Sequence, residues 1–185
     1  MRWPAAVSAI SNPAASLLAW PVACYIRHQR DRLRDRATGL SPDTKAQLRP
    51  YFAAADLDRV RILETDRLPI PALPFRRTAR RMGLDFLDPS QIAAITFDDV
   101  IAAQQPLRPP LLFHELVHVV QFRMLGVTAF ARLYTRGFLS TGSYAKIPLE
   151  RCARDLERRA ASDPVPLDVA SEVAAWLEAD RYNCP

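Results

Sequence analysis

The stretch that decides the fold is Leu112-Phe113-His114-Glu115-Leu116-Val117-His118-Val119-Val120-Gln121, a HExxH motif within an apolar run. Residues four apart lie above one another on one face of an α-helix. His114 and His118 are therefore expected to present both imidazoles to one metal ion, with Glu115 as the general base for a metal-held water. The chain has only three histidines, and two of them lie in this motif. The pattern predicts a zinc-binding helix.

A catalytic zinc ion needs a third ligand, since such sites use three protein ligands and leave the fourth position to water. The longer HExxHxxGxxH signature requires Gly and His where this chain has Gln121 and Met124, so the three-histidine class is excluded. A carboxylate is the usual partner of two histidines. Glu150 is the best candidate because it lies two residues after Pro148, in the first turn of a helix predicted downstream. The other candidates are Cys152, Asp155, Glu157 and Glu172.

Two segments carry a resemblance to a known family. HELVHVVQ at 114–121 is followed by a Gly-bounded segment with Phe and Tyr, and then by Y-x-x-x-P-L-E-x-x-A at 144–153. This arrangement resembles the HExxH domains grouped as eCIS-core-like, a domain of unknown function. Those domains are similar to minimal gluzincins, which are zinc metallopeptidases with two His and a downstream Glu. The resemblance covers about residues 55–160 and implies zinc ligation by His114, His118 and Glu150, with Glu115 as the catalytic base.

Two supporting roles stay open. A ligating histidine normally donates its other ring N–H to an acceptor, and many gluzincins carry for this an Asp at the position that is Arg154 here. The acceptor is therefore expected among Asp98, Asp99, Asp155 and the backbone carbonyls. Hydrolysis also develops an oxyanion that needs a hydrogen-bond donor besides the metal. The phenol of Tyr144 is the first candidate for this catalytic role, and Tyr134 is the second.

Hydrophobic periodicity predicts an α+β fold that is predominantly helical with a small β-sheet, and the resemblance implies a zincin-like active-site helix. The segments 57–64 and 92–101 are each predicted as one strand. The motif helix is expected to run from residue 111 to a cap at Gly126, with a second helix over 128–139. Further helices are expected over 14–36, broken at Pro21, and over 42–48, 149–161 and 167–182.

Length and composition fit one globular unit with an attached arm. The 185 residues are 49% hydrophobic, which is enough for a core. We divide the chain into an N-terminal helical arm, 1–54, and a minimal gluzincin-like metallopeptidase domain, 55–185. Residues 3–26 are mostly apolar, but Asn12, Pro13 and Pro21 interrupt them and disfavour a signal peptide or a membrane span. A cytoplasmic location is expected, with export through this apolar segment as the alternative.

The formal charge of +5 comes from arginine, which clusters at 27–36, 76–81 and 151–159. Acidic residues interrupt these clusters and no aromatic–basic pattern accompanies them, so no nucleic acid is expected as a partner, and peripheral contact with an anionic membrane is a lesser alternative. The sequence predicts a Zn²⁺-dependent peptidase acting on a peptide or protein substrate. The alternative is a non-catalytic, zinc-stabilised interaction module that binds a partner protein and is associated with a secretion or injection system.

Overall fold

The computed structural model describes residues 13–70, 92–163 and 165–182. The arginine cluster at 76–81 and residues 3–12 of the apolar N-terminal segment lie outside these ranges. The elements follow the chain as α1 (Pro13–Arg34), α2 (Pro42–Leu48), α3 (Ala54–Arg59), β1 (Arg61–Glu64), β2 (Ala94–Phe97), β3 (Val100–Ala103), α5 (Pro109–Thr141), η2 (Tyr144–Lys146), α6 (Pro148–Ser162) and α7 (Val169–Glu178). The predicted α+β fold, predominantly helical with a small sheet, is confirmed.

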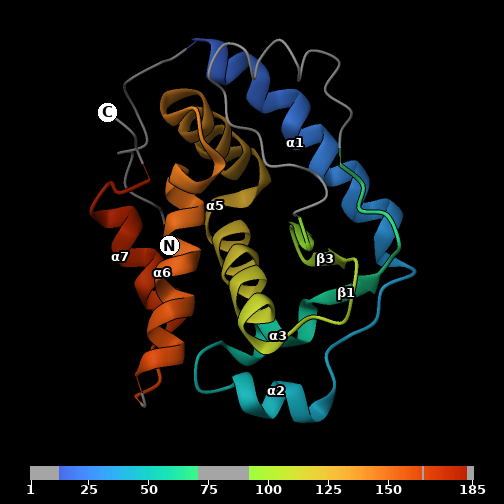
Figure 1. Cartoon of the computed structure of the whole chain (residues 1–185). Coiled ribbons are helices and arrows are strands. Elements are labelled where there is room, and N and C mark those ends of the chain that lie inside the picture. The colour runs from blue at the N-terminus through green and yellow to red at the C-terminus, as the bar shows by residue number, and fades with distance from the viewer. Residues whose placement is uncertain (1–12, 71–91, 164, 183–185) are drawn as a thin grey trace.

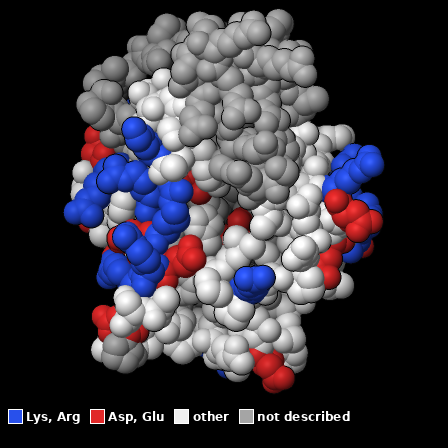
Figure 2. Space-filling model, in the orientation of Figure 1, with Lys and Arg blue, Asp and Glu red and all other residues white. Residues whose placement is uncertain are grey.

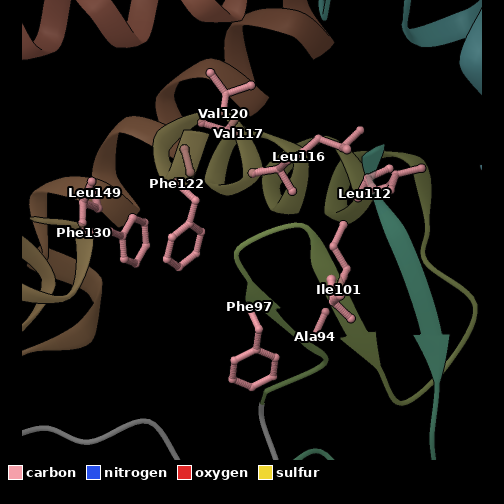
Figure 3. Close-up of a cluster of buried hydrophobic side chains, with 14 of the residues drawn as sticks. Ala94, Phe97, Ile101, Leu112, Leu116, Val117, Val120, Phe122, Phe130 and Leu149 are labelled. Carbon is pink, nitrogen blue, oxygen red and sulfur yellow. The ribbon is translucent and has the colours of Figure 1, made fainter. Parts of the chain in front are cut away.

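Helix α5 lies in the middle of the molecule, with α6 on one side and the sheet on the other (Figure 1). Its N-terminal half carries the HExxH motif and lies over the β2–β3 hairpin. Leu112 and Leu116 of this half face Ala94 and Ile101 of the hairpin (Figure 3). These side chains are all at most 9% exposed and belong to one hydrophobic core cluster. Burial of this apolar face fixes the rotation of the helix about its axis and so decides which way the histidines point.

The sheet has three strands in the order β1-β3-β2, with β3 parallel to β1 and antiparallel to β2. The prediction of a single strand over 92–101 is therefore wrong, because the chain reverses at Asp98-Asp99. Asp98 adopts a φ of 57°, a left-handed conformation that aspartate tolerates better than most residues. The strand predicted over 57–64 begins only at Arg61, since Ala54–Arg59 forms α3.

The hairpin turn is held against α1 by a partly buried ion-pair cluster. Asp99 is 4% exposed and accepts hydrogen bonds from Arg30 Nε at 2.9 Å and Arg30 Nη2 at 3.2 Å, and also from Arg34. Burial alone would raise the pKa of Asp99, but the two guanidinium groups lower it below its usual value. Ion pairs between Asp99 and two arginines thus hold the turn between β2 and β3 against α1.

Helix α1 runs through Pro21 without ending, so the predicted break is absent. It packs on α5 and contributes Ala23, Ile26 and Leu33 to the common core, whereas Leu17 and Trp20 are 77% and 70% exposed. Among the described helices α5 alone is long and apolar enough to cross a membrane, but 56% of its apolar window is buried. Core helices of globular proteins meet the same criterion.

Gly126 divides α5 into two helical halves, as the sequence predicted. Its φ of 73° and ψ of 156° are not helical, and this combination is accessible almost only to glycine. Phe122 and Phe130, four residues before and after the break, stack with ring centroids 3.7 Å apart. The second half continues to Thr141 and is closed by Gly142 in the left-handed conformation. The break turns the second half of α5 back toward the motif.

Candidate metal centre

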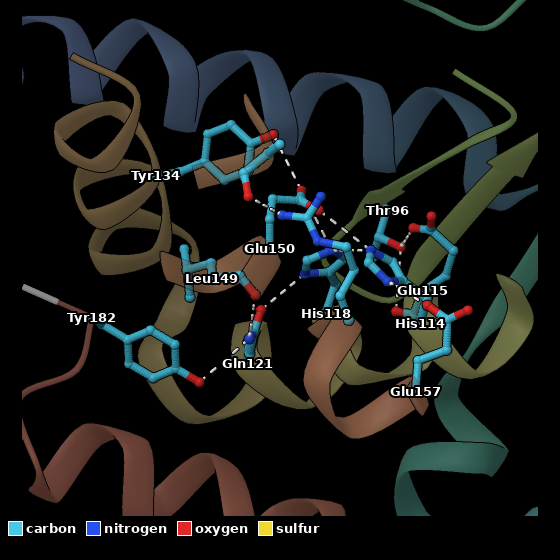
Figure 4. A network of polar contacts seen from close by, with 12 residues as sticks. Thr96, His114, Glu115, His118, Gln121, Tyr134, Leu149, Glu150, Glu157 and Tyr182 are labelled. Atoms are coloured by element: carbon cyan, nitrogen blue, oxygen red, sulfur yellow. Dashed lines mark hydrogen bonds and ion pairs between the residues drawn. The ribbon is translucent and has the colours of Figure 1, made fainter. Parts of the chain in front are cut away.

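Three side chains converge on one point between α5 and α6. His114 and His118 project from the same face of α5, and Glu150 projects from the first turn of α6 (Figure 4). The two histidine Nε2 atoms are 3.2 Å apart. Glu150 Oε2 lies 3.3 Å from His114 Nε2, and Glu150 Oε1 lies 3.5 Å from His118 Nε2. The structure therefore brings together the three ligands predicted from the sequence.

These distances fit one metal ion. In a tetrahedral site with metal–ligand distances of about 2.0–2.1 Å, neighbouring ligand atoms lie about 3.3–3.4 Å apart. The distance of 3.2 Å between the two Nε2 atoms, and those of 3.3 and 3.5 Å from these nitrogens to the two Glu150 oxygens, lie close to this value. Glu150 is only 3% exposed, yet its Oε2 atom has no hydrogen-bond partner. Buried carboxylate oxygens are normally paired or bound to metal, so the donor set fits a zinc ion in its centre.

The outer nitrogens of both rings face acceptors. His114 Nδ1 lies 3.2 Å from Glu157 Oε2, and His118 Nδ1 lies 2.8 Å from Gln121 Oε1. The orientation of the Gln121 amide follows from its other end, where Nε2 donates to the Leu149 carbonyl at 3.1 Å. Because Glu157 and Gln121 accept at Nδ1, each neutral ring carries its proton there and turns the Nε2 lone pair to the centre. This is the tautomer that metal ligation requires.

The charge of the centre also favours a cation. Burial disfavours a charged His118 ring, but Glu150, with contributions from Glu115 and Gln121, raises the pKa of His118 to about 9. Burial likewise disfavours an ionised Glu150, yet the His118 and His114 imidazoles hold the pKa of this carboxyl well below its usual range. The centre thus attracts positive charge, which a proton supplies in the absence of metal. A divalent cation would replace that proton.

Glu115 is fixed on the sheet side of the centre. It is 5% exposed, and its Oε2 atom accepts a hydrogen bond of 2.6 Å from the Thr96 hydroxyl on β2. Thr96 is itself only 9% exposed. A buried carboxylate held at one oxygen keeps its second oxygen for another partner, which is what a general base in this position needs.

Two tyrosines lie on the other side of Glu150. Tyr134, in the second half of α5, donates to Glu150 Oε1 at 3.3 Å. Tyr144 in η2 packs edge-on against Tyr134, with ring centroids 6.4 Å apart. Burial, followed by the Glu150 carboxylate, raises the pKa of both phenols above the usual value of 10. Both hydroxyls therefore stay protonated and remain donors.

The break at Gly126 is what brings Tyr134 to the centre. In an uninterrupted helix, 16 residues would separate His118 from Tyr134 by about 24 Å. Instead, Tyr134 contacts Glu150, which is itself 3.5 Å from His118. Phe130 lies between them, edge-on to His118 at 6.1 Å and parallel to Tyr134 at 5.8 Å. Both halves of α5 thus contribute side chains to the centre.

The remaining candidates from the sequence lie elsewhere or have other partners. The two aspartates of the hairpin turn bind arginine and not the histidines: Asp98 pairs with Arg59 at 2.9 Å, and Asp99 with α1. The other acidic candidates and the cysteine are also engaged. Asp155 pairs with Arg158, Glu172 with Arg159, and Cys152 with the Tyr182 hydroxyl. The third histidine, His28, is exposed on α1.

Sequence reasoning missed three residues that surround the centre. Thr96 is the one polar residue in the apolar run 92–97, and Gln121 is a polar residue within the apolar motif helix; each of these was a usable signal for a buried hydrogen bond. Glu157 was weighed only as an alternative ligand. Its place seven residues after Glu150 puts both side chains on one face of α6. Glu157 can therefore contact Nδ1 of His114, the ring nitrogen that faces away from the centre.

Comparison of the chain with protein-family models, with curated proteins and with solved structures found no match.

Proposed function

We propose that this protein is a zinc-dependent, metallopeptidase-like hydrolase with His114, His118 and Glu150 as ligands. The observation that carries the proposal is the convergence of the two histidine Nε2 atoms, 3.2 Å apart, on the Glu150 carboxylate, whose Oε2 lies 3.3 Å from His114 and whose Oε1 lies 3.5 Å from His118. These separations fit tetrahedral zinc. Two histidines and one glutamate leave the fourth position for water, as in catalytic sites, whereas structural zinc sites have four protein ligands. This agrees with the resemblance to eCIS-core-like HExxH domains and minimal gluzincins.

The residues around the ligands supply the parts of a hydrolytic mechanism. Zinc held by His114, His118 and Glu150 would supply Lewis-acid chemistry, since it would polarise a carbonyl and lower the pKa of coordinated water to about 7. Glu115, held by Thr96, accepts the proton of the attacking water and passes it to the leaving amine. Tyr144 keeps its phenolic proton and donates to the oxyanion, while Tyr134 is engaged with Glu150.

Strand β2 offers a place for a peptide substrate. It is an edge strand among the described residues, because it pairs with β3 alone. Thr96 of this strand contacts Glu115, so the strand lies directly beside the general base. An extended peptide that adds to such an edge gains main-chain hydrogen bonds. The substrate class that fits the site is therefore a peptide or protein in extended conformation.

The test is the Glu115→Gln variant, with Glu64→Gln as the matched control on the exposed end of β1. Metal analysis is expected to find one zinc ion per chain in the wild type and in both variants. Turnover of a fluorogenic peptide library is expected in the wild type and the control, and is expected to fall by about 10³-fold in Glu115→Gln. That figure follows from the 10²–10⁴-fold contribution of general-base catalysis. Undiminished cleavage by Glu115→Gln would overturn the proposal.

The burial of the ligands favours a second candidate, a non-catalytic zinc-stabilised module. The resemblance to eCIS-core-like domains implies that such a module would bind a partner protein of a secretion or injection apparatus. All three ligands are at most 9% exposed, and they join α5 to α6. A metal that ties two helices together stabilises the fold itself. In this case His118→Ala loses zinc and lowers the melting temperature, whereas wild-type protein shows no turnover on any peptide. Turnover by the wild-type protein therefore separates the candidates, because both predict zinc binding through His118.

A further inference from the structure

A groove lies beside the metal centre, on the face formed by α6 and α7. Its volume is about 580 Å³, and four arginines line it together with Trp176 and two carboxylates. This volume lies within the range of roughly 300–1,000 Å³ found for ligand sites. The arginines gather over α6 on the surface of the molecule (Figure 2). They are Arg151, Arg154, Arg158 and Arg181.

The groove is continuous with the centre through two residues. Glu157 lines the groove, and its Oε2 atom is 3.2 Å from Nδ1 of the ligand His114. Arg154 also lines the groove, and it follows the ligand Glu150 by one turn on the same face of α6. Its guanidinium donates to the carbonyl of Ala145, the residue after Tyr144. A ligand in the groove therefore reaches Glu157, the residue that contacts the outer nitrogen of His114.

The positive charge of the groove is only partly neutralised. Arg158 pairs with Asp155 at 3.0 Å, and the carboxylate of Glu157 is engaged with His114. Among the described residues, neither Arg151 nor Arg154 forms an ion pair with a carboxylate. The guanidinium of Arg181 lies over the Trp176 ring, 5.5 Å from its centroid.

We propose that this groove binds carboxylates of a peptide whose adjoining backbone lies at the metal centre. That this peptide is a substrate rests on the proposed hydrolase function. Guanidinium groups match the planar geometry of carboxylates and bind them in a bidentate manner. The carboxylates belong either to Asp and Glu side chains or to the free C-terminus of the peptide. Asp155 and Glu157 in the lining oppose a densely charged polyphosphate, so the arrangement favours an acidic peptide over a nucleic acid.

The experiment measures binding by fluorescence anisotropy, so it does not depend on turnover. Three labelled peptides of equal length serve as probes. One contains glutamates and is amidated, one contains glutamines in their place with a free C-terminus, and one is the amidated glutamine peptide. Each is titrated with zinc-loaded and with metal-free protein at low and physiological salt. An equally long single-stranded oligonucleotide is the polyanion probe.

Two matched variants locate the binding. Arg151→Gln/Arg154→Gln is expected to weaken the carboxylate peptides at least tenfold. The control Arg36→Gln/Arg49→Gln removes the same charge from α1–α2 surfaces, where both side chains are exposed, and is expected to retain the wild-type affinity. If loss of the Arg154 contact to Ala145 disturbs folding, Arg151→Gln/Arg181→Gln replaces the first variant. Circular dichroism and melting curves establish which variants are folded.

The outcomes distinguish the groove from the proposed hydrolysis. Preference for the glutamate peptide identifies side-chain carboxylates as the groups that bind the groove. Preference for the peptide with a free C-terminus identifies the terminal carboxylate instead. Equal binding of all three peptides, unchanged affinity of the groove variants, or a preference for the oligonucleotide would each overturn the inference. Carboxylate binding without any cleavage would support the inferred peptide groove and refute the proposed hydrolase activity. Cleavage without a preference for acidic peptides would support the proposed hydrolase activity and refute the inferred peptide groove.

Discussion

Gln121 is the residue whose replacement tests the architecture of the centre most directly. It is fully buried, its Oε1 atom accepts from His118 Nδ1 at 2.8 Å, and its Nε2 atom donates to the Leu149 carbonyl at 3.1 Å. The Nε2 atom also donates to the Tyr182 hydroxyl at 3.3 Å. Gln121→Met gives a side chain of similar length and volume but removes all three hydrogen bonds. His118 then loses the acceptor that fixes its tautomer and ring orientation.

The magnitude follows from these contacts. Loss of a partner behind a metal-bound histidine costs about 10–100-fold in metal affinity, which corresponds to about 1.4–2.8 kcal/mol. In the metal-free protein, the ring N–H left without an acceptor costs about 1–3 kcal/mol. For a protein of this size, that cost lowers the melting temperature by roughly 2–12 °C. Loss of the hydrogen bond to the Leu149 carbonyl adds little to this destabilisation, because that carbonyl still accepts a backbone hydrogen bond within α6.

Zinc affinity is measured by competition with a chromophoric chelator, and stability by thermal denaturation with and without zinc. Gln29→Met is the matched control, because Gln29 is also buried but lies on α1 with its Oε1 atom unpaired. This control is expected to bind zinc with wild-type affinity. If Gln121→Met bound zinc within threefold of the wild type, the inferred role of Gln121 in orienting His118 would be refuted.

Three further changes probe neighbouring parts of the structure. Thr96→Val removes the 2.6 Å hydrogen bond to Glu115; turnover is expected to fall about 10–100-fold with zinc content unchanged, and a kcat equal to that of the wild type would contradict this. Asp99→Asn is expected to cost about 1–3 kcal/mol at neutral pH. Because the folded-state pKa of Asp99 is lowered, its contribution is present above the unfolded-state pKa of about 3.9 and is lost as the pH falls through the folded-state pKa. Urea denaturation at several pH values should therefore show the wild type and this variant converging in acid, and a constant difference would refute the assignment. Gly137→Ala would place a Cβ atom 2.8 Å from Pro148 Cδ, so it is expected to cost about 1–3 kcal/mol and to weaken zinc binding by displacing the start of α6. Gly39→Ala, which meets only a side-chain atom at 3.6 Å, is the control and should melt like the wild type.

Local rules explain why the three candidate ligands could be predicted. The spacing of His114 and His118 places both rings on one face of any α-helix, and a proline-started helix downstream places Glu150 in a first turn. The same rules predicted the interruption at Gly126, since glycine is the residue that leaves helical conformation most readily. They failed at residues 92–101, where two apolar strands are separated by only two residues and the pattern of one long strand is almost the same.

The sequence alone determined the helix that presents His114 and His118 on one face and the strongest candidate for a third ligand, because these depend on contacts within one helix turn or on a single helix start. Only the tertiary structure decided what surrounds them. Thr96, Gln121 and Glu157 make contacts across 19, 28 and 43 residues of sequence, and Tyr134 reaches Glu150 only because α5 folds back at Gly126. Such contacts depend on how the helices and the hairpin pack together, and a periodic pattern along one segment does not carry that information.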